Sequence, residues 1–169
     1  ILRDSHGYTV ILGIRDCSVQ RNNQKVLEES GSTMLPELLK RDVQKYAAAI
    51  AQEVDYIGAG TVEFIYDLDA NAVYFMEMNT RIQVEHPVTE EVINYDLVKE
   101  QIMIAAGQPI SGKDYEPLKH AIECRINAED PAHNFRPSPG KITNFHIPGG
   151  HGIRVDTHAY AGYQIPANY

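Results

Sequence analysis

The sequence feature that most limits the fold is the stretch FMEMNTRIQVEHP, residues 75–87, in which polar and apolar side chains alternate. Successive side chains of a β-strand leave on opposite faces, so this period predicts a strand with two unlike faces. One face carries acids, amides and a guanidinium group: Glu77, Asn79, Arg81, Gln83 and Glu85. The other face is mostly apolar, and we expect it to pack into a core through Met76, Met78, Ile82 and Val84.

A partner strand is predicted directly upstream. The segments TVEFIY and AVYFMEM flank the polar DLDANA, and a hairpin centred near Ala70 places Glu63 opposite Glu77. Directly opposed side chains lie roughly 4.5–5.5 Å apart at Cβ, where like charges are unfavourable. Such a pair needs a shared proton or a cation, and carboxylate oxygens are ligands that Mg²⁺ prefers. We therefore expect a metal site of Glu63 and Glu77 with Asn79 beside them, the alternative being a solvated hairpin face with an accidental acidic pair.

The rest of the polar face predicts an anion site. Arg81 offers a planar fork suited to carbonate, carboxylate or phosphate, and Gln83 can donate beside it. Glu85 is a candidate base. The alternative is an ordinary surface ion pair between a guanidinium and a carboxylate.

The remaining segments predict an α+β fold. Residues 8–14 form a predicted strand, and residues 36–54 a helix with one buried face, because their apolar positions recur near every 3.6 residues. A second helix is expected over 89–106, closed by Gly107 and Pro109. The runs HAIECRINAE, GKITNFHI and GIRVDTHAY predict a further antiparallel sheet.

Composition excludes several classes of function. The formal net charge of -8, with no Lys/Arg-rich run, argues against nucleic acid or an anionic membrane as a partner. The two cysteines, Cys17 and Cys124, are far apart, so we expect no disulfide framework, no zinc site and a reducing, cytoplasmic location. The chain starts at Ile1 without Met, which predicts a fragment of a larger protein.

Seven motifs together resemble biotin carboxylase, the ATP-grasp component of biotin-dependent carboxylases such as acetyl-CoA carboxylase. The motifs are RDCSVQR..QK, GAGTVEF, MEMNTRIQVEHPVTE, AAGQPI, ECRINAEDP, PSPGKIT and YAGY. The resemblance implies that residues 1–110 are the C-terminal portion of an ATP-grasp domain, an antiparallel sheet flanked by helices. Residues 111–169 would begin the biotin carboxylase C-terminal domain.

The resemblance also implies roles for individual residues. ATP and bicarbonate would give carboxyphosphate, whose CO₂ is transferred to biotin. Glu63, Glu77 and Asn79 match ligands of Mg²⁺ or Mn²⁺, and Glu85 matches the base that deprotonates bicarbonate. Bicarbonate itself would be held by Arg81, Gln83 and the backbone N–H of Val84.

Further matches concern the nucleotide and the biotin. Lys25 matches a lysine near carboxyphosphate, and Arg125 a residue that stabilises the biotin enolate. Nucleotide contacts would involve Gln20, Asn23, Lys25, Glu63 and Glu77. The family usually has Arg-Arg-His or Arg-Arg-Asn where this chain has Arg21-Asn22-Asn23, so Asn23 could bind a ribose hydroxyl but could not act as an acid.

Partners follow from the same resemblance: a biotin carboxyl carrier protein, carboxyltransferase subunits and a second copy in a homodimer whose contact includes GGHGIRVDTH, residues 149–158. A role in fatty acid biosynthesis is implied. The glycine-rich lid of the family has no counterpart here, so we expect the isolated chain to be inactive. Two alternatives are a non-catalytic dimerisation module and another ATP-grasp ligase, such as a carbamoyl-phosphate synthetase.

Overall fold

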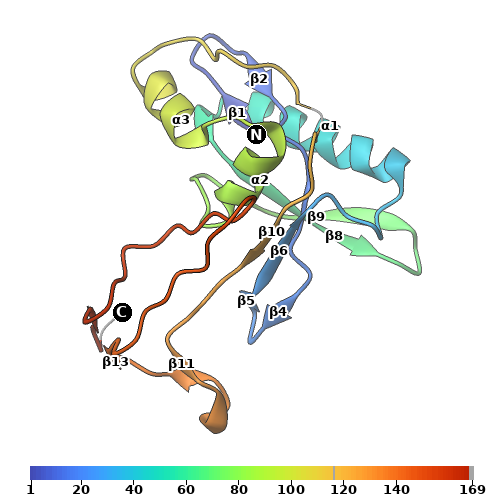
Figure 1. The fold of residues 1–169 in the computed structure, drawn as a ribbon. Coiled ribbons are helices and arrows are strands. Elements are labelled where there is room, and N and C mark those ends of the chain that lie inside the picture. Colours follow the sequence, from blue (N-terminus) through green and yellow to red (C-terminus); the bar gives the residue numbers. More distant parts are fainter. Residues whose placement is uncertain (116, 168–169) are drawn as a thin grey trace. The chain divides into compact units, whose positions relative to one another are not determined.

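The computed structural model describes residues 1–115 and 117–167 and divides into two compact units, Ile1–Arg125 and Ile126–Tyr169 (Figure 1). The expected α+β class is confirmed: three α-helices accompany strand pairs that are all antiparallel in the described residues. Among the described residues, no helix combines the length and apolar character needed to cross a membrane.

The core of the first unit lies between a small sheet and two helices. Strands β1 (Leu2–Arg3), β2 (Thr9–Val10) and β7 (Gly58–Ala59) pair in the order β2-β1-β7. The core residues are Leu2, Val10, Leu12, Ala59, Val92, Ile93, Leu97, Ile104 and Ile110. The predicted strand over 8–14 is shorter than expected, because the N–H of Ile11 donates to Asp114 Oδ1 at 2.8 Å, outside the ladder.

A second sheet pairs β3 (Arg15–Asp16), β6 (Leu27–Ser30) and β10 (Ile122–Cys124) in the order β10-β6-β3. Beside it, β4 (Gln20–Arg21) and β5 (Gln24–Lys25) form a hairpin. Its turn residues Asn22 and Asn23 both have positive φ, 51° and 61°. Asparagine tolerates this region, and two such residues in succession suit a two-residue hairpin turn.

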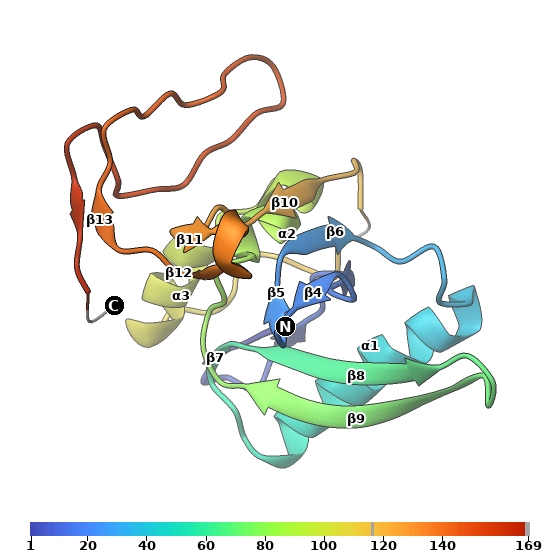
Figure 2. The same cartoon turned by 90° about the horizontal axis from the view of Figure 1, so that it is seen from below.

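The predicted helix over 36–54 is confirmed as α1 (Glu37–Glu53). It buries Val43, Ala47 and Ala51, whereas Leu38, at 74% exposure, and Val54, at 62%, lie outside the buried face. Figure 2 shows α1 beside the hairpin of β8 (Thr61–Asp67) and β9 (Ala72–Asn79), which it contacts.

The single predicted helix over 89–106 is wrong, because the structure has two helices there. Helix α2 (His86–Ile93) starts earlier, with Pro87 in its first turn, where a proline is well tolerated. It ends at Asn94, whose φ of 54° is left-handed. Helix α3 (Leu97–Ala105) then starts afresh, capped by Asp96, whose side chain accepts from the N–H of Lys99 at 2.8 Å.

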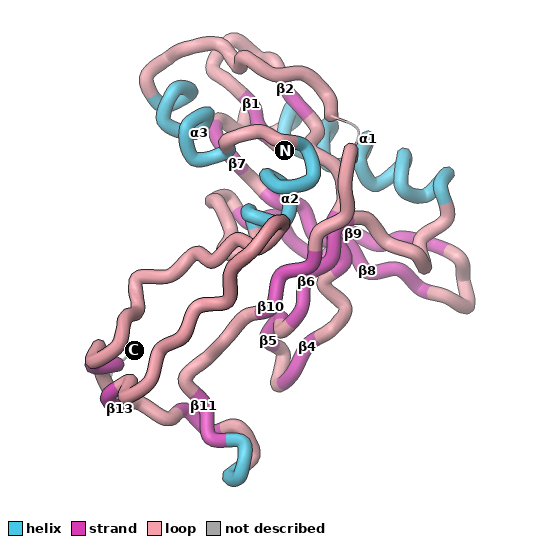
Figure 3. Tube along the Cα trace, viewed as in Figure 1, coloured by secondary structure: helices cyan, strands magenta, loops and turns pink. Residues whose placement is uncertain are grey.

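The second unit contains short strand pairs and long connections (Figure 3). Strands β11 (Glu129–Asp130) and β12 (Arg136–Pro137) flank the 3₁₀ helix Pro131–His133, and β13 (Gly140–Lys141) pairs with β14 (Gln164–Ile165). The prediction of a strand in GIRVDTHAY is wrong. Local hydrogen bonds turn this segment, from the N–H of Ile153 to Gly150 O and from that of Ala159 to Thr157 Oγ1.

Candidate active site

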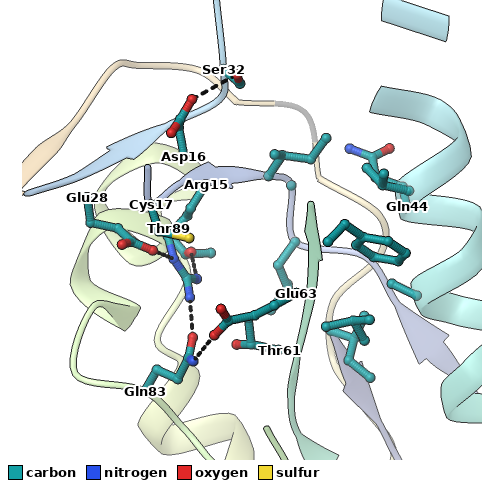
Figure 4. Close-up of a pocket in the computed structure, with 18 of the residues that line it drawn as sticks. Arg15, Asp16, Cys17, Glu28, Ser32, Gln44, Thr61, Glu63, Gln83 and Thr89 are labelled. Atoms are coloured by element: carbon teal, nitrogen blue, oxygen red, sulfur yellow. Dashed lines mark hydrogen bonds and ion pairs between the residues drawn. The ribbon is translucent and has the colours of Figure 1, made fainter. Parts of the chain in front are cut away.

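A cavity of about 590 Å³ lies in the first unit. Residues from α1, from β8 and β9 and from the segment that contains β3 line it. Figure 4 shows Glu63 of β8 pointing into this cavity, with Gln83 and Arg15 close to it. Five of the predicted site residues line it: Gln20, Lys25, Glu63, Arg81 and Gln83. The cavity is therefore bordered by Glu63 of the predicted metal residues and by Arg81 and Gln83 of the predicted anion residues, whereas Glu77, Asn79, Val84 and Glu85 are not among its lining residues.

The predicted opposition of two carboxylates is confirmed. Glu63 pairs with Glu77 across the β8–β9 ladder, and a register shift follows directly between Glu63 and Phe64. Asn79 donates through Nδ2 to Glu63 Oε1 at 3.1 Å and to Glu77 Oε1 at 2.9 Å. One amide group thus bridges the pair, which reduces the repulsion expected between like charges.

Glu63 of this pair also contacts a basic side chain, which it shares with Glu85. Lys25 Nζ lies 2.8 Å from Glu63 Oε1 and 3.0 Å from Glu85 Oε1, and all three side chains are at most 15% exposed. Burial alone would lower the pKa of Lys25, but the hydrogen bonds to Glu63 and Glu85 outweigh it and raise the pKa. Lys25 is therefore a fixed cation between two carboxylates.

The anion residues lie on a loop instead of a strand. Strand β9 ends at Asn79, and the chain then passes through a turn into α2, as the sequence HP at 86–87 allows. Buried and exposed residues still alternate here, but the polar residues are the buried ones: Gln83 is 6% exposed and Glu85 4%, whereas Val84 is 59% exposed. The expectation that Val84 packs into the core is wrong.

Met76 also departs from the expectation, since it is 47% exposed. The register shift accounts for this, because Glu63 pairs with Glu77 while Phe64 pairs with Phe75, which leaves Met76 as the extra residue of a bulge. Ile82, by contrast, packs against the core as predicted. Met78 is half-buried.

Glu85, the predicted base, is buried at the start of α2. Burial opposes its ionisation, but the hydrogen bond and positive charge of Lys25 outweigh this and lower the pKa of Glu85. The carboxylate is thus ionised near neutral pH, the state in which it can accept a proton. Arg81 is exposed and donates to Ile82 O at 3.2 Å and to Asn79 Oδ1 at 3.4 Å.

One partly buried cation was not singled out from the sequence. Arg15 donates to three acceptors: Glu28 Oε1 at 3.0 Å, Thr89 Oγ1 at 2.8 Å and Gln83 Oε1 at 2.8 Å (Figure 4). The amide of Gln83 then donates through Nε2 to Glu63 Oε1 at 3.0 Å. Arg15 lies in the motif RDCSVQR, but its partners are 13, 68 and 74 residues away in the sequence, so spacing alone gave no signal.

Arg125 is placed on the sheet next to these residues. Its N–H donates to Val26 O at 3.0 Å, which extends the pairing of β10 with β6 and places Arg125 beside the segment that follows Lys25. Gln20 lines the cavity and donates to Cys17 O at 3.1 Å. Asn23 is exposed in the β4–β5 turn and is not among the residues that line the cavity.

A metal ion at this site would have two carboxylate ligands from the chain. Within residues 1–115 and 117–167, no group of three or more His, Cys, Asp or Glu side chains is arranged to hold a metal ion. Mg²⁺ is usually bound through one or two carboxylates, with water and substrate phosphates supplying its other ligands. The residues present therefore fit Mg²⁺ together with a phosphate-containing substrate.

Two family models match the chain. Residues 1–113 match the family described as Carbamoyl-phosphate synthase L chain, ATP binding domain, and residues 123–169 match the Biotin carboxylase C-terminal domain. The chain is 56% identical to Biotin carboxylase 1 of Bacillus subtilis (strain 168) and covers 38% of that protein. It is 52% identical to the Biotin carboxylase of Allochromatium vinosum and covers 37% of it. In both cases the whole of the present chain is matched.

Solved structures agree with this result. The biotin carboxylase domain of the 2-oxoglutarate carboxylase of Hydrogenobacter thermophilus matches with a TM-score of 0.93 and 46% identity over 99% of this chain and 37% of that one. That crystal structure is a domain dimer in complex with MgADP, ADP and bicarbonate. The biotin carboxylase subunit of a pyruvate carboxylase matches with the same TM-score and 48% identity.

Proposed function

Because the chain belongs to the biotin carboxylase family, we propose that it supplies the metal-binding and bicarbonate-binding side of an ATP-dependent biotin carboxylation site. The observation that carries this proposal is that Glu63 and Glu85 both contact the ammonium group of Lys25. Gln83 and Asn79 donate hydrogen bonds to the same Glu63. Asn79, Gln83 and Glu85 belong to the motif EMNTRIQVEHPVTE, Lys25 belongs to the QK that precedes it, and Glu63 belongs to GAGTVEF, which are motifs that resemble the family.

Glu63 and Glu77 would hold Mg²⁺ or Mn²⁺, with Asn79 beside them. When bound, the metal would neutralise charge on the phosphates of ATP. The support within the chain is that both carboxylates face one hairpin side, and that each already accepts a hydrogen bond from Asn79.

The anion half would act on bicarbonate. Arg81, the amide of Gln83 and the N–H of Val84 would hold it, and Glu85 would remove its proton. The resulting oxygen nucleophile attacks the γ-phosphorus of ATP, so that carboxyphosphate forms and ADP leaves. Lys25 would hold phosphoryl oxygens as a point charge, which its charged state in this network supports.

The acceptor would be biotin on a carrier protein. Carboxyphosphate would release CO₂ to biotin, and Arg125 would stabilise the biotin enolate as a fixed cation. Carboxyltransferase subunits would then use the carboxybiotin, and the intact protein would be a homodimer. The position of Arg125 beside the strand that follows Lys25 supports its assignment to the same site.

The test uses the intact carboxylase that contains these residues and measures bicarbonate-dependent ATP cleavage with and without free biotin. We expect Glu85→Gln to lower turnover by about 10²–10⁴-fold, since it removes the base. Glu77→Gln should raise the Mg²⁺ concentration needed for half-maximal activity. Glu53→Gln, an exposed carboxylate at the end of α1, is the matched control and should leave both unchanged.

Normal turnover in Glu85→Gln, or ATP cleavage that ignores bicarbonate, would overturn the proposal. A module that serves only dimerisation would show no bicarbonate-dependent cleavage in any variant. Another ATP-grasp ligase would cleave ATP without stimulation by biotin.

A further inference from the structure

Arg15 is held by acceptors on three different segments. Its Nε meets Glu28 of β6, its Nη1 meets Thr89 of α2 and its Nη2 meets Gln83 of the connecting loop, at 3.0, 2.8 and 2.8 Å. The Arg15 side chain is 16% exposed, and the three partner residues are 2–7% exposed. A guanidinium fixed on three sides in this way has little freedom to turn toward a ligand.

This arrangement decides which end of the Gln83 amide faces the cavity. A guanidinium has donors only, so the atom of Gln83 that faces Arg15 must be the acceptor Oε1. The donor Nε2 is then forced to the other side, where it meets Glu63 Oε1 at 3.0 Å (Figure 4). Side-chain amides are otherwise ambiguous, since oxygen and nitrogen can exchange places by a half-turn.

We propose that Arg15 is a positioning residue, which locks the Gln83 amide with its N–H groups toward the cavity and so makes Gln83 a donor for a bound anion. For bicarbonate as that anion, the inference rests on the function proposed above. Arg15 would not itself contact the anion, because Glu28 neutralises it and its Nη atoms are engaged by Thr89 and Gln83.

Without Arg15, only the donation from Nε2 to Glu63 Oε1 would hold the Gln83 amide, and the amide could turn more easily. Gln83 Oε1 would lose its only guanidinium partner in the described residues, and an orientation with Oε1 toward the cavity would place an acceptor against an anion. The affinity for the anion should fall, while contacts to the nucleotide through other residues should persist. The signature is therefore a raised KM for bicarbonate with a nearly unchanged KM for ATP.

The experiment measures both KM values in the intact carboxylase for Arg15→Met, Gln83→Met and the double variant. Loss of a hydrogen bond to a charged group predicts a rise in KM for bicarbonate of about tenfold in Gln83→Met. Arg15→Met should show a similar rise, and the double variant should be no worse than Gln83→Met, because both changes remove the same donor.

Arg3→Met is the matched control. Arg3 is a buried arginine, 8% exposed, and it donates to Tyr56 O and Asp55 Oδ1 away from the cavity residues named above. The Arg3→Met variant should lower the stability of the fold without changing the KM for bicarbonate or the KM for ATP. If Arg15→Met yields no folded protein, Arg15→Lys retains the charge opposite Glu28 but loses the planar fork, and a smaller rise in KM for bicarbonate is expected.

The outcomes separate this inference from the proposed function. If Gln83→Met leaves KM for bicarbonate unchanged, the assignment of Gln83 to the anion site is wrong, and the inference falls with it. If Gln83→Met raises that KM but neither Arg15 variant does, the function stands and the positioning role is wrong. Additive effects in the double variant would also overturn it, because they would mean that Arg15 acts on bicarbonate independently of Gln83.

Discussion

At the scale of single residues, the site is organised by two partly buried cations with different contacts. Lys25 contacts Glu63 and Glu85 directly, and Arg15 contacts Gln83, which in turn contacts Glu63. Glu63 Oε1 therefore accepts from Lys25, Gln83 and Asn79 at 2.8, 3.0 and 3.1 Å. A carboxylate oxygen with three donors is well satisfied, so removal of a neutral donor, Gln83 or Asn79, is expected to be less harmful than removal of the positive charge of Lys25.

The first prediction concerns that charge. Lys25→Met leaves Glu63 and Glu85 buried without a counter-charge, and removal of one partner of a buried ion pair costs about 3–5 kcal/mol of the free energy of unfolding. Urea unfolding of the 169-residue chain at neutral pH, followed by circular dichroism, measures this loss. Lys40→Met is the control, since its ion pair with Glu37 is exposed and should contribute less than about 1 kcal/mol.

The same pair predicts a pH dependence. Because the folded chain lowers the pKa of Glu85, the stabilisation is present above the ordinary value of 4.5 and is lost as pH falls through the lower, folded pKa. The difference in stability between wild type and Lys25→Met should therefore narrow below about pH 4.5. An equal difference at neutral and at acid pH would contradict the assignment of this stability to the Lys25–Glu85 pair.

At the scale of elements, the sequence pattern correctly predicted those features that depend on residues close together in the sequence. The β8–β9 hairpin and the opposition of Glu63 and Glu77 follow from a short polar turn between two alternating segments. The break at Asn94 was missed, although Asn at a helix end and Asp96 as a cap are both typical signals. The contacts of Arg15 could not be predicted, because they join residues brought together only by the tertiary fold.

The pairing of β10 with β6 places a second pair of carboxylates face to face. Glu123 lies opposite Glu28, which is 2% exposed and whose Oε2 has no hydrogen-bond partner in the described residues. Burial raises the pKa of Glu123 to about 7, and the negative charges of Glu85 and Glu28 contribute in the same direction. The positive charges of Arg125 and Arg15 oppose the rise.

Glu123→Gln should therefore stabilise the chain above pH 7. A raised pKa means that the folded chain binds the proton more tightly, so the stabilisation is complete below about pH 4.5 and is lost as pH rises through about 7. Since Glu123 is only half-buried, solvent screening leaves a gain of about 0.2–1 kcal/mol for the neutral variant at about pH 8. This gain is measured by comparing the urea unfolding midpoints of wild type and Glu123→Gln below about pH 4.5 and above about pH 7.

Glu29→Gln is the matched control. Glu29 is the next residue of β6, so its side chain leaves on the opposite face, where His120 Nε2 lies 3.0 Å from it. The Glu29→Gln variant should be no more stable than wild type at the higher pH. If Glu123→Gln and wild type had the same midpoint at both pH values, the two opposed carboxylates would not interact in the way described.

At the scale of the whole molecule, the chain contains segments that match two different family models. The family models cover residues 1–113 and 123–169, and the first compact unit extends to Arg125. Strand β10, residues 122–124, pairs with β6 inside this unit and brings Glu123 and Arg125 next to the Lys25 segment. We propose that residues 1–110 are the ATP-grasp portion and that the segment from 111 onward begins the C-terminal domain.

The last prediction is that the 169-residue chain alone carboxylates biotin at little or no measurable rate. It covers only 37–38% of the length of its relatives from Allochromatium vinosum and Bacillus subtilis, and phosphoryl transfer depends on charges preorganised around a substrate from which water is excluded. The measurement is bicarbonate-dependent release of phosphate from ATP by the purified chain, with the intact carboxylase as the positive control. If the short chain turned over ATP within about tenfold of the rate of that control, a barrier difference of only about 1.4 kcal/mol, these residues would be sufficient for catalysis and the prediction would be refuted.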